Sequence, residues 1–223
     1  MLKAIIFDMD GVLVNSIESM RKSFAKVLEM QGIDTQEFNV IDKERFEWRP
    51  LRDQLQLWET ELWIYQSLDV VAFSREAHKH QLEIGKNDFL PNPSTLQLIK
   101  VAREKGIKIA VATSSRRERA VNLLTLVDIY DTLDAFISYE DIINGKPNPE
   151  CFLKAAEALA VDSKECVVIE DAVNGIQAAK TAGMKAIARV IPERRSKDFD
   201  QADLFFWNFE ELLLLDIEKL FIV

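Results

Sequence analysis

Three short apolar runs in this chain each end at residues that can bind or react. They cover residues 4–7, 107–112 and 166–169. Each run is rich in Ile, Val, Phe or Ala and is too short for a typical helix, which predicts a strand buried on both faces. Strands of this kind are typical of a parallel sheet with helices on both faces. The pattern therefore favours an α/β fold built on a doubly wound parallel sheet.

The first run is followed by two carboxylates, Asp8 and Asp10, and then by Gly11. Ligands of parallel sheets bind beyond the carboxyl ends of the strands, where both acids are expected. One carboxylate can attack as a nucleophile while the other moves a proton, provided that a cation offsets their repulsion. Taken alone, the pair is explained more simply as two solvated acids in a turn.

The second run ends in three hydroxyl residues, Thr113, Ser114 and Ser115. Ser115 and Glu118 have the spacing of a capping box, which predicts a helix from Arg116 and a capping role for Ser115. Thr113 is expected between the strand end and the helix N-terminus. Its hydroxyl and the nearby backbone N–H groups can hold a phosphate there, or the hydroxyl can simply cap the helix.

A lysine stands in a loop that two prolines stiffen, at residues 144–149. Pro147 and Pro149 lead into a helix predicted to begin at about Glu150. Lys146, held in this way, can place its charge on a phosphate and on a neighbouring carboxylate. Most loop lysines are solvated instead, so this signal is weak when taken alone.

The third run ends in Glu170 and Asp171, before a helix predicted to stop at Gly183. Asp171 can serve as the N-cap of that helix. Together with Asp8 and Asp10, however, these acids place four carboxylates at the ends of neighbouring strands. They repel one another unless a cation lies among them. Oxygen ligands with one lysine and no histidine or cysteine nearby fit Mg²⁺ better than zinc.

Residues 16–90 show helical stripes instead of strand runs. One apolar face is closed by Gly32, and a second covers residues 51–65. We therefore predict a core domain of residues 1–15 and 91–223, with a helical domain, residues 16–90, inserted into it.

The composition of the chain argues against several classes of protein. The formal charge of −9, without a basic stripe, argues against a nucleic-acid surface. No stretch approaches the roughly 20 apolar residues that span a bilayer, and the chain enters its first strand without room for a signal peptide. Cys151 and Cys166 form no disulfide framework, so a cytoplasmic location is expected. His78 and His80 lie in a polar helical stretch and are expected at the surface.

The order of these motifs resembles the haloacid dehalogenase superfamily, and most closely its branch of phosphoglycolate phosphatases and β-phosphoglucomutases. The shared features are DxDG at residues 8–11, a threonine after the second strand, GKPxP at residues 145–149 and a strand that ends in Glu-Asp. The resemblance covers roughly residues 1–15 and 90–210. It implies a Rossmann-like core, an inserted helical cap and Mg²⁺ as cofactor.

The resemblance also implies a role for each motif residue. Asp8 is the nucleophile that forms an aspartyl-phosphate, and Asp10 is the general acid and base. Dehalogenases lack this second aspartate, so Asp10 argues against that activity. The phosphoryl group is bound by Thr113, Ser114 and Lys146. The implied Mg²⁺ ligands are Asp8, the main-chain carbonyl of Asp10, Asp171, and Glu170 either directly or through water.

The predicted cap departs from its relatives. β-Phosphoglucomutases carry an aspartate and a histidine where this chain has Asn15 and Met20, and a Lys-Gly-x-Ser stretch near residues 47–50. These differences argue against mutase activity. Three side chains of the cap are candidate substrate contacts, or equally ordinary residues of a helix: Trp48, Arg49 and Arg52. An arginine suits an anionic group of the substrate, and a tryptophan can stack on a ring.

The sequence therefore predicts a Mg²⁺-dependent phosphatase that acts on a small phosphorylated metabolite, as a monomer or weak homodimer. Neither nucleic acid nor a membrane is an expected partner. One alternative is a sugar-phosphate mutase. Another is a non-catalytic binding or regulatory module that keeps the fold.

Overall fold

The structure is a computed structural model that describes residues 1–35, 69–84, 89, 91, 93–190 and 197–222. The chain divides into two compact units. One, the core unit, comprises Met1–Asn15 and Phe89–Val223, and the second unit comprises Ser16–Asp88. Each unit is described by itself.

The described part of the core unit holds a sheet of six parallel strands in the order β3-β2-β1-β4-β5-β6. The strands are β1 (Ala4–Phe7), β2 (Lys108–Ala112), β3 (Ala135–Ile137), β4 (Cys166–Glu170), β5 (Lys185–Arg189) and β6 (Leu204–Phe206). The central strand β1 pairs with both β2 and β4, so that Ile6 lies beside Ala110 on one side and Val168 on the other. The strand order reverses at β1, which confirms the predicted doubly wound α/β fold.

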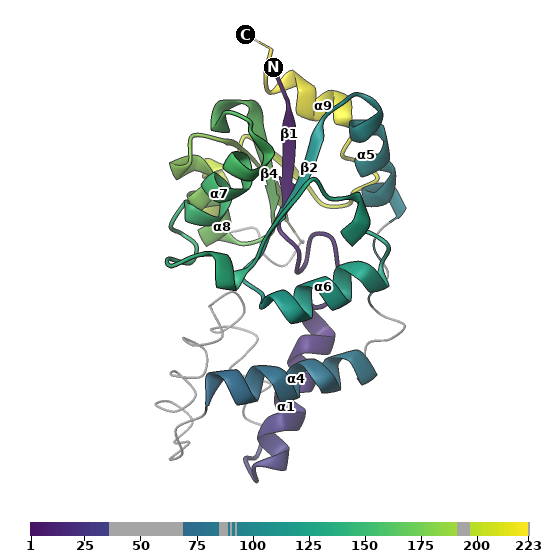
Figure 1. Cartoon of the computed structure of the whole chain (residues 1–223), viewed down its shortest axis with the longest axis vertical. Helices are drawn as coiled ribbons and strands as arrows, with labels where there is room; N and C mark the ends of the chain where they lie inside the picture. Colours follow the sequence, from purple (N-terminus) through teal and green to yellow (C-terminus); the bar gives the residue numbers. More distant parts are fainter. Residues whose placement is uncertain (36–68, 85–88, 90, 92, 191–196, 223) are drawn as a thin grey trace. The chain divides into compact units, whose positions relative to one another are not determined.

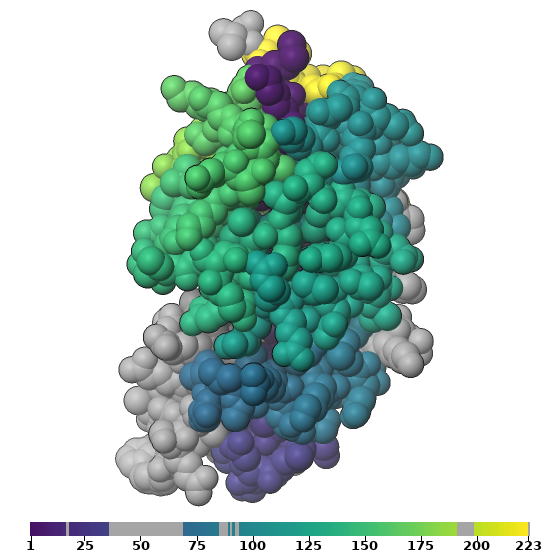
Figure 2. Space-filling model, viewed as in Figure 1, coloured from purple at the N-terminus to yellow at the C-terminus, as the bar shows by residue number. Residues whose placement is uncertain are grey.

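Helices cover both faces of this sheet (Figure 1). Helices α7 and α8 pack together on one side, and α5 and α9 pack together on the other. The helices of the core unit are α5 (Pro93–Glu104), α6 (Arg117–Leu126), α7 (Glu150–Leu159), α8 (Val173–Thr181) and α9 (Leu214–Lys219). On the face shown in Figure 2, their side chains leave little of the purple strand β1 visible.

The central strands are buried on both faces, as their apolar runs predict. Ala4 and Ile6 belong to a core cluster with Phe152 of α7, while Ile5 and Phe7, which alternate with them, are just as fully buried. Because successive side chains of a strand point to opposite faces, β1 can supply both layers of the core only if it is apolar throughout. This burial fixes the strand, and with it the position of the acids that follow.

Two predicted helix boundaries are confirmed. Helix α7 begins at Glu150, directly after the loop that carries Lys146. Helix α8 ends at Thr181, and Gly183 follows in the left-handed region with φ of +76°. A glycine at that position closes a helix without the strain that a side chain would add.

The second unit contains helices α1 (Ile17–Met30) and α4 (Val70–Ile84), which pack against each other. Phe24 and Phe73 meet edge to face, with ring centroids 5.5 Å apart. Gln81 is buried and donates hydrogen bonds to the Ser16 carbonyl at 3.0 Å and to Ser19 Oγ at 3.2 Å. Apolar packing and a buried polar network therefore both hold the two helices together.

The surface prediction for His78 is wrong. Its side chain is buried, on the face of α4 that also buries Phe73, Ala77 and Gln81, while His80 is half-buried beside Glu76. The stretch is polar in composition, but its buried positions follow helical spacing, and His78 lies on the buried face. The overall polarity of the stretch therefore did not indicate which of its histidines is buried.

Several predictions concern residues outside the described part of the chain. They are the second helical stripe at 51–65 and the candidate substrate contacts Trp48, Arg49 and Arg52. Among the residues that are described, no helix is both long and apolar enough to cross a membrane.

Candidate active site

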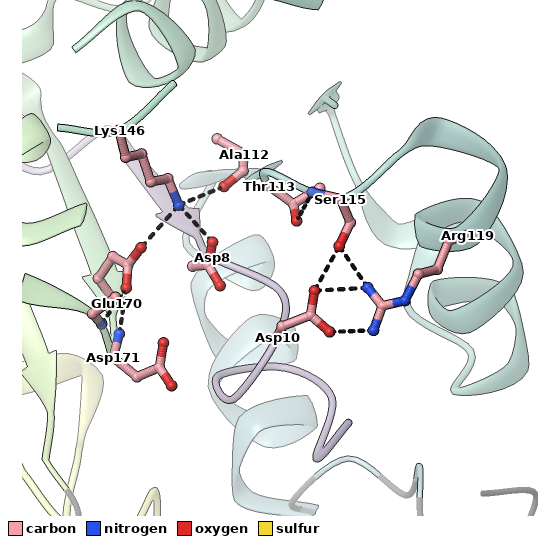
Figure 3. Close-up of polar contacts among 10 residues, drawn as sticks. Asp8, Asp10, Ala112, Thr113, Ser115, Arg119, Lys146, Glu170 and Asp171 are labelled. Carbon is pink, nitrogen blue, oxygen red and sulfur yellow. Dashed lines mark hydrogen bonds and ion pairs between the residues drawn. The ribbon is translucent and has the colours of Figure 1, made fainter. Parts of the chain in front are cut away.

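Three neighbouring strands end at one edge of the sheet, and each presents a predicted site residue there (Figure 3). Asp8 follows β1, Thr113 follows β2 and Glu170 is the last residue of β4. The backbone N–H of Asp8 donates to the Ile169 carbonyl at 2.9 Å, so the strand pairing continues up to the acid itself. The sheet therefore sets the position of the Asp8 side chain.

Lys146 joins all three of these strand ends. Its ammonium group donates to Asp8 Oδ1 at 2.5 Å, to Glu170 Oε1 at 2.8 Å and to the Ala112 carbonyl at 3.3 Å. Asp171 follows Glu170 and is also buried. We call Asp8, Lys146, Glu170 and Asp171 the nucleophile cluster, after the role predicted for Asp8. Figure 3 shows them grouped around the carboxyl ends of β1 and β4.

Burial and the oppositely charged neighbours act in opposite directions on the pKa values of Asp8 and Lys146. Burial raises the pKa of Asp8 to about 7, against the opposing influence of the Lys146 ammonium, while Glu170 adds to the increase. Burial also works to lower the pKa of Lys146, but the carboxylates of Asp8 and Glu170 outweigh it and hold that pKa well above its usual value. Lys146 therefore remains a cation, and the charge on Asp8 depends on what else enters the site.

The loop around Lys146 is held by the first turn of α7. Glu150 accepts hydrogen bonds from the backbone N–H groups of Ile143 and Asn144, each at 2.9 Å, which lowers its pKa to about 2. Two residues further along α7, the centroid of the Phe152 ring lies 4.9 Å from Lys146 Nζ. Glu150 thus ties the start of the loop to the helix that follows it, and the Phe152 ring makes a cation–π contact with the Lys146 ammonium group.

The Glu170 carboxylate is fixed by the start of the next loop. Its Oε2 accepts from the backbone N–H groups of Asp171 and Ala172, each at 2.6 Å. Gly175 leaves the space that this side chain occupies, because a Cβ at that position would lie 1.9 Å from Glu170 Oε1. The N-cap of α8 is Ala172, so Asp171 does not serve as the cap of that helix.

The nucleophile cluster fits a divalent cation. Asp8, Glu170 and Asp171 each offer a carboxylate oxygen, and these oxygens lie within 4.8 Å of one another in a buried position. Three acids around one ammonium leave excess negative charge, and carboxylate oxygens are the ligands that Mg²⁺ prefers. The ligand role predicted for the Asp10 main-chain carbonyl stays a prediction.

Asp10 faces a different group of residues (Figure 3). Arg119 donates to Asp10 Oδ1 at 2.7 Å and to Oδ2 at 2.8 Å, and Ser115 Oγ donates to Oδ2 at 2.7 Å. Arg119 also donates to Ser115 Oγ at 2.5 Å. We call these three residues the Asp10 clamp. Its side chains are partly or largely buried, with 21% of Asp10 and 10% of Arg119 exposed.

The capping prediction for Ser115 is wrong. Helix α6 begins at Arg117, and the side chain of its N-cap residue, Arg116, makes no capping hydrogen bond; the backbone N–H of Arg117 donates to Glu140 Oε2 at 2.8 Å instead. The Ser115 hydroxyl instead donates to Asp10, because the helix starts one residue later than the capping-box spacing implies and Ser115 lies before the cap. Thr113 is buried and its Oγ1 accepts from the Ser115 backbone N–H at 3.0 Å, whereas Ser114 is exposed.

Two arginines near the site were not predicted from the sequence. Arg119 lies in the first turn of α6, and no local pattern in the sequence marks it as a partner of Asp10. Arg189 is the last residue of β5, whose three central residues are apolar and buried, so it lies at the carboxyl end of that strand. Its guanidinium donates to the Gly11 carbonyl, and burial lowers its pKa against the opposing influence of Asp171.

Comparison with known proteins agrees with this geometry. A family model described as haloacid dehalogenase-like hydrolase matches residues 2–183. The chain is 30% identical over 190 residues to a phosphorylated carbohydrates phosphatase of Thermotoga maritima, covering 85% of this chain and 86% of that protein. It is 29% identical over 218 residues to hexitol phosphatase B of Escherichia coli, covering 96% of each. Among solved structures, a β-phosphoglucomutase from Clostridium difficile matches with a TM-score of 0.79 and 26% identity, covering 98% of this chain and 96% of that one.

Proposed function

Because the chain belongs to the haloacid dehalogenase-like hydrolase family, we propose that it is a Mg²⁺-dependent phosphatase that works through an aspartyl-phosphate on Asp8. The observation that carries the proposal is the nucleophile cluster, in which a buried carboxylate, a buried lysine and two further acids meet at the ends of adjacent strands. A carboxylate placed in this way can attack phosphorus, and the cations offset the charge that otherwise repels the phosphate.

The chain's residues divide the reaction into two steps. Asp8 Oδ attacks phosphorus, the ester bond to the leaving oxygen breaks, and that oxygen takes a proton from Asp10. A water molecule then attacks the phosphorus of the aspartyl-phosphate and gives its proton to Asp10, which releases Asp8 and inorganic phosphate. Lys146 and Thr113 hold the phosphoryl oxygens throughout. When bound by Asp8, Glu170 and Asp171, Mg²⁺ supplies positive charge to the phosphoryl group and lowers its repulsion from the nucleophile.

The substrate class that we propose is a phosphorylated sugar or sugar alcohol. Support comes from two relatives that each match more than four fifths of the chain, covering 85% and 96% of it, one named for phosphorylated carbohydrates and the other for hexitols. We further propose that the second unit acts as the cap that selects the organic part of the substrate. In that case the specificity contacts lie among residues 16–90, where Trp48, Arg49 and Arg52 remain candidates.

Phosphate release from a panel of hexose phosphates and hexitol phosphates tests the proposal. We expect turnover with Mg²⁺, none above background with EDTA, and none in Asp8→Asn, whose amide cannot form the aspartyl-phosphate. Turnover that persists in EDTA or in Asp8→Asn would overturn the mechanism. The absence of turnover on every phosphate ester, with Mg²⁺ present, would favour the non-catalytic binding module instead.

Mutase activity is the second candidate, because a β-phosphoglucomutase is among the similar structures. Asn15 and Met20 differ from the aspartate and histidine of such enzymes, which makes hydrolysis the preferred proposal. Incubation of a hexose 1-phosphate with a trace of the bisphosphate separates the two, because a mutase accumulates the 6-phosphate and a phosphatase accumulates free sugar. The cytoplasmic location and the monomer or weak homodimer stay predictions.

A further inference from the structure

Arg119 is a buried arginine whose guanidinium contacts both oxygens of one carboxylate. Only 9% of the residue is exposed, and two of its nitrogens bond to Asp10 at 2.7 and 2.8 Å. This two-point geometry fixes the plane of the carboxyl group as well as its position, which a single hydrogen bond does not do. Ser115 adds a third contact to Oδ2.

The Asp10 side chain is oriented by residues outside its own turn. Asp10 lies in the loop after β1, where Gly11 has φ of +80° and its N–H donates to the Val14 carbonyl at 2.9 Å. The backbone of this turn is therefore fixed, but the Asp10 side chain leaves it toward α6. Its orientation consequently depends on side chains of α6 and of the loop before it.

The same loop carries the candidate phosphate-binding residue. Ser115 donates through its backbone N–H to Thr113 Oγ1 at 3.0 Å and through its hydroxyl to Asp10. A continuous set of hydrogen bonds thus runs from Thr113 through Ser115 to Asp10, and Arg119 bonds to its last two members. These hydrogen bonds therefore hold the Asp10 side chain in a fixed orientation relative to the segment that would bind the phosphate.

We propose that Arg119 is a positioning residue for the phosphatase reaction, which sets the orientation of Asp10 relative to the phosphoryl group. This role rests on the proposed function, because it acts only through the proton transfers assigned to Asp10. Arg119 contacts Asp10 and Ser115, and it is assigned no contact with the phosphoryl group or with the leaving oxygen. Its removal therefore lowers kcat and leaves KM within about threefold, since the residues proposed to bind the phosphate remain in place.

A double-mutant cycle on p-nitrophenyl phosphate tests this role. Its leaving group needs little protonation, so Asp10→Asn keeps a measurable activity, and the loss in that variant falls on the second step, in which Asp10 accepts the proton of the attacking water. We expect Arg119→Ala to lower kcat by about 10- to 100-fold, which is at most the lower end of the loss on the order of 10²–10⁴ that removal of an acid–base group causes, because Asp10 itself remains. Arg119→Lys, which keeps the charge but not the two-point geometry, recovers part of this loss. In the Asp10→Asn background, Arg119→Ala causes no further loss.

Arg117→Ala provides the matched control. Arg117 lies in the same helix and pairs with another aspartate, Asp141, at 2.5 Å, so its removal leaves kcat within about twofold. A further loss of kcat when Arg119→Ala is added to Asp10→Asn overturns the positioning role, since Arg119 then acts independently of Asp10. If the unaltered chain shows no Mg²⁺-dependent turnover, the proposed function fails, and the role of Arg119 fails with it.

Discussion

The nucleophile cluster and the Asp10 clamp lie at the same edge of the sheet but differ in the balance of their positive and negative charges. The cluster places one ammonium among three buried acids, and only 4% of the Lys146 side chain and 2% of that of Glu170 are exposed. The clamp pairs one carboxylate with one guanidinium, and 21% of the Asp10 side chain is exposed. The cluster is electrostatically incomplete and suited to receive a cation, whereas the clamp is complete and suited to orient a group.

This difference predicts how each region responds to a lost partner. Removal of a cation from the cluster leaves buried acids without compensation, which is costly because water does not reach them. Removal of a partner from the clamp leaves a carboxylate that is already partly hydrated, so the cost is smaller. The variants below test this contrast from the largest expected effect to the smallest.

Lys146→Met removes the cation of the nucleophile cluster and gives the largest expected effect. We expect kcat to fall on the order of 10³-fold, because both Asp8 and the phosphate lose their fixed positive charge. Urea unfolding without metal should show a loss of about 3–5 kcal/mol, the usual result of breaking a buried ion pair. Mg²⁺ should recover part of the lost stability.

The surface pair of Lys105 and Glu218 supplies the control for that variant. Lys105 contacts Glu218 at 2.9 Å, but half of its side chain is exposed. Lys105→Met should therefore change stability by less than about 1 kcal/mol and leave kcat unaltered. Equal losses of stability in the two variants would show that the cluster is not the incomplete site that its burial implies.

Gly175→Ala tests the space around Glu170. A Cβ at this position would lie 1.9 Å from Glu170 Oε1 and must displace a carboxylate that also bonds to Lys146. We expect kcat to fall about 10²-fold, the scale that an error of about 1 Å in a site causes, together with weaker Mg²⁺ activation. Gly145→Ala is the control, because nothing lies within 4 Å of its Cβ. A normal metal requirement in Gly175→Ala would argue against Glu170 as part of the metal site.

The sequence predicted the nucleophile cluster far better than the clamp, for a physical reason. Asp8, Glu170 and Asp171 follow apolar strands, and strand order alone brings the ends of β1 and β4 together. Lys146 was found from its prolines, which mark a constrained loop. These are local patterns whose spatial consequence is set by the sheet, so their meeting could be inferred before the geometry was known.

Arg119 carries no such mark. It lies in the polar sequence at the start of a helix, and its partner is 109 residues away. Ser115 had a local explanation as a helix cap, and that explanation was wrong because α6 begins at Arg117. Likewise, the polar composition around His78 gave no sign of its burial. Contacts between side chains distant in sequence depend on how far each helix is rotated, and a hydrophobic pattern of a few residues does not fix that angle.

The affinity of the nucleophile cluster for Mg²⁺ is expected to depend on pH. Burial raises the pKa of Asp8 to about 7, so below this pH a metal ion must displace a proton to bind the carboxylate. We expect the apparent Kd for Mg²⁺ to tighten by up to about tenfold per pH unit as the pH rises toward 7, and to level off above it. Calorimetry in two buffers of different ionisation enthalpy measures the proton that is released. Asp8→Asn should remove that proton, and an unchanged release in this variant would assign it to another group.

Ser115→Ala gives the smallest expected effect, because it removes one contact of the Asp10 clamp and leaves Arg119 in place. We expect kcat to fall about two- to tenfold, as the loss of one hydrogen bond to a charged group allows, with KM unchanged. Thr181→Ala removes a comparable hydroxyl, which donates to the Gln177 carbonyl at 2.8 Å on the exposed surface of α8, and should leave kcat unchanged. If Ser115→Ala lowered kcat as much as Lys146→Met does, the loss of one partner would affect the Asp10 clamp as severely as it affects the nucleophile cluster. The contrast between a complete and an incomplete charge arrangement would then be wrong.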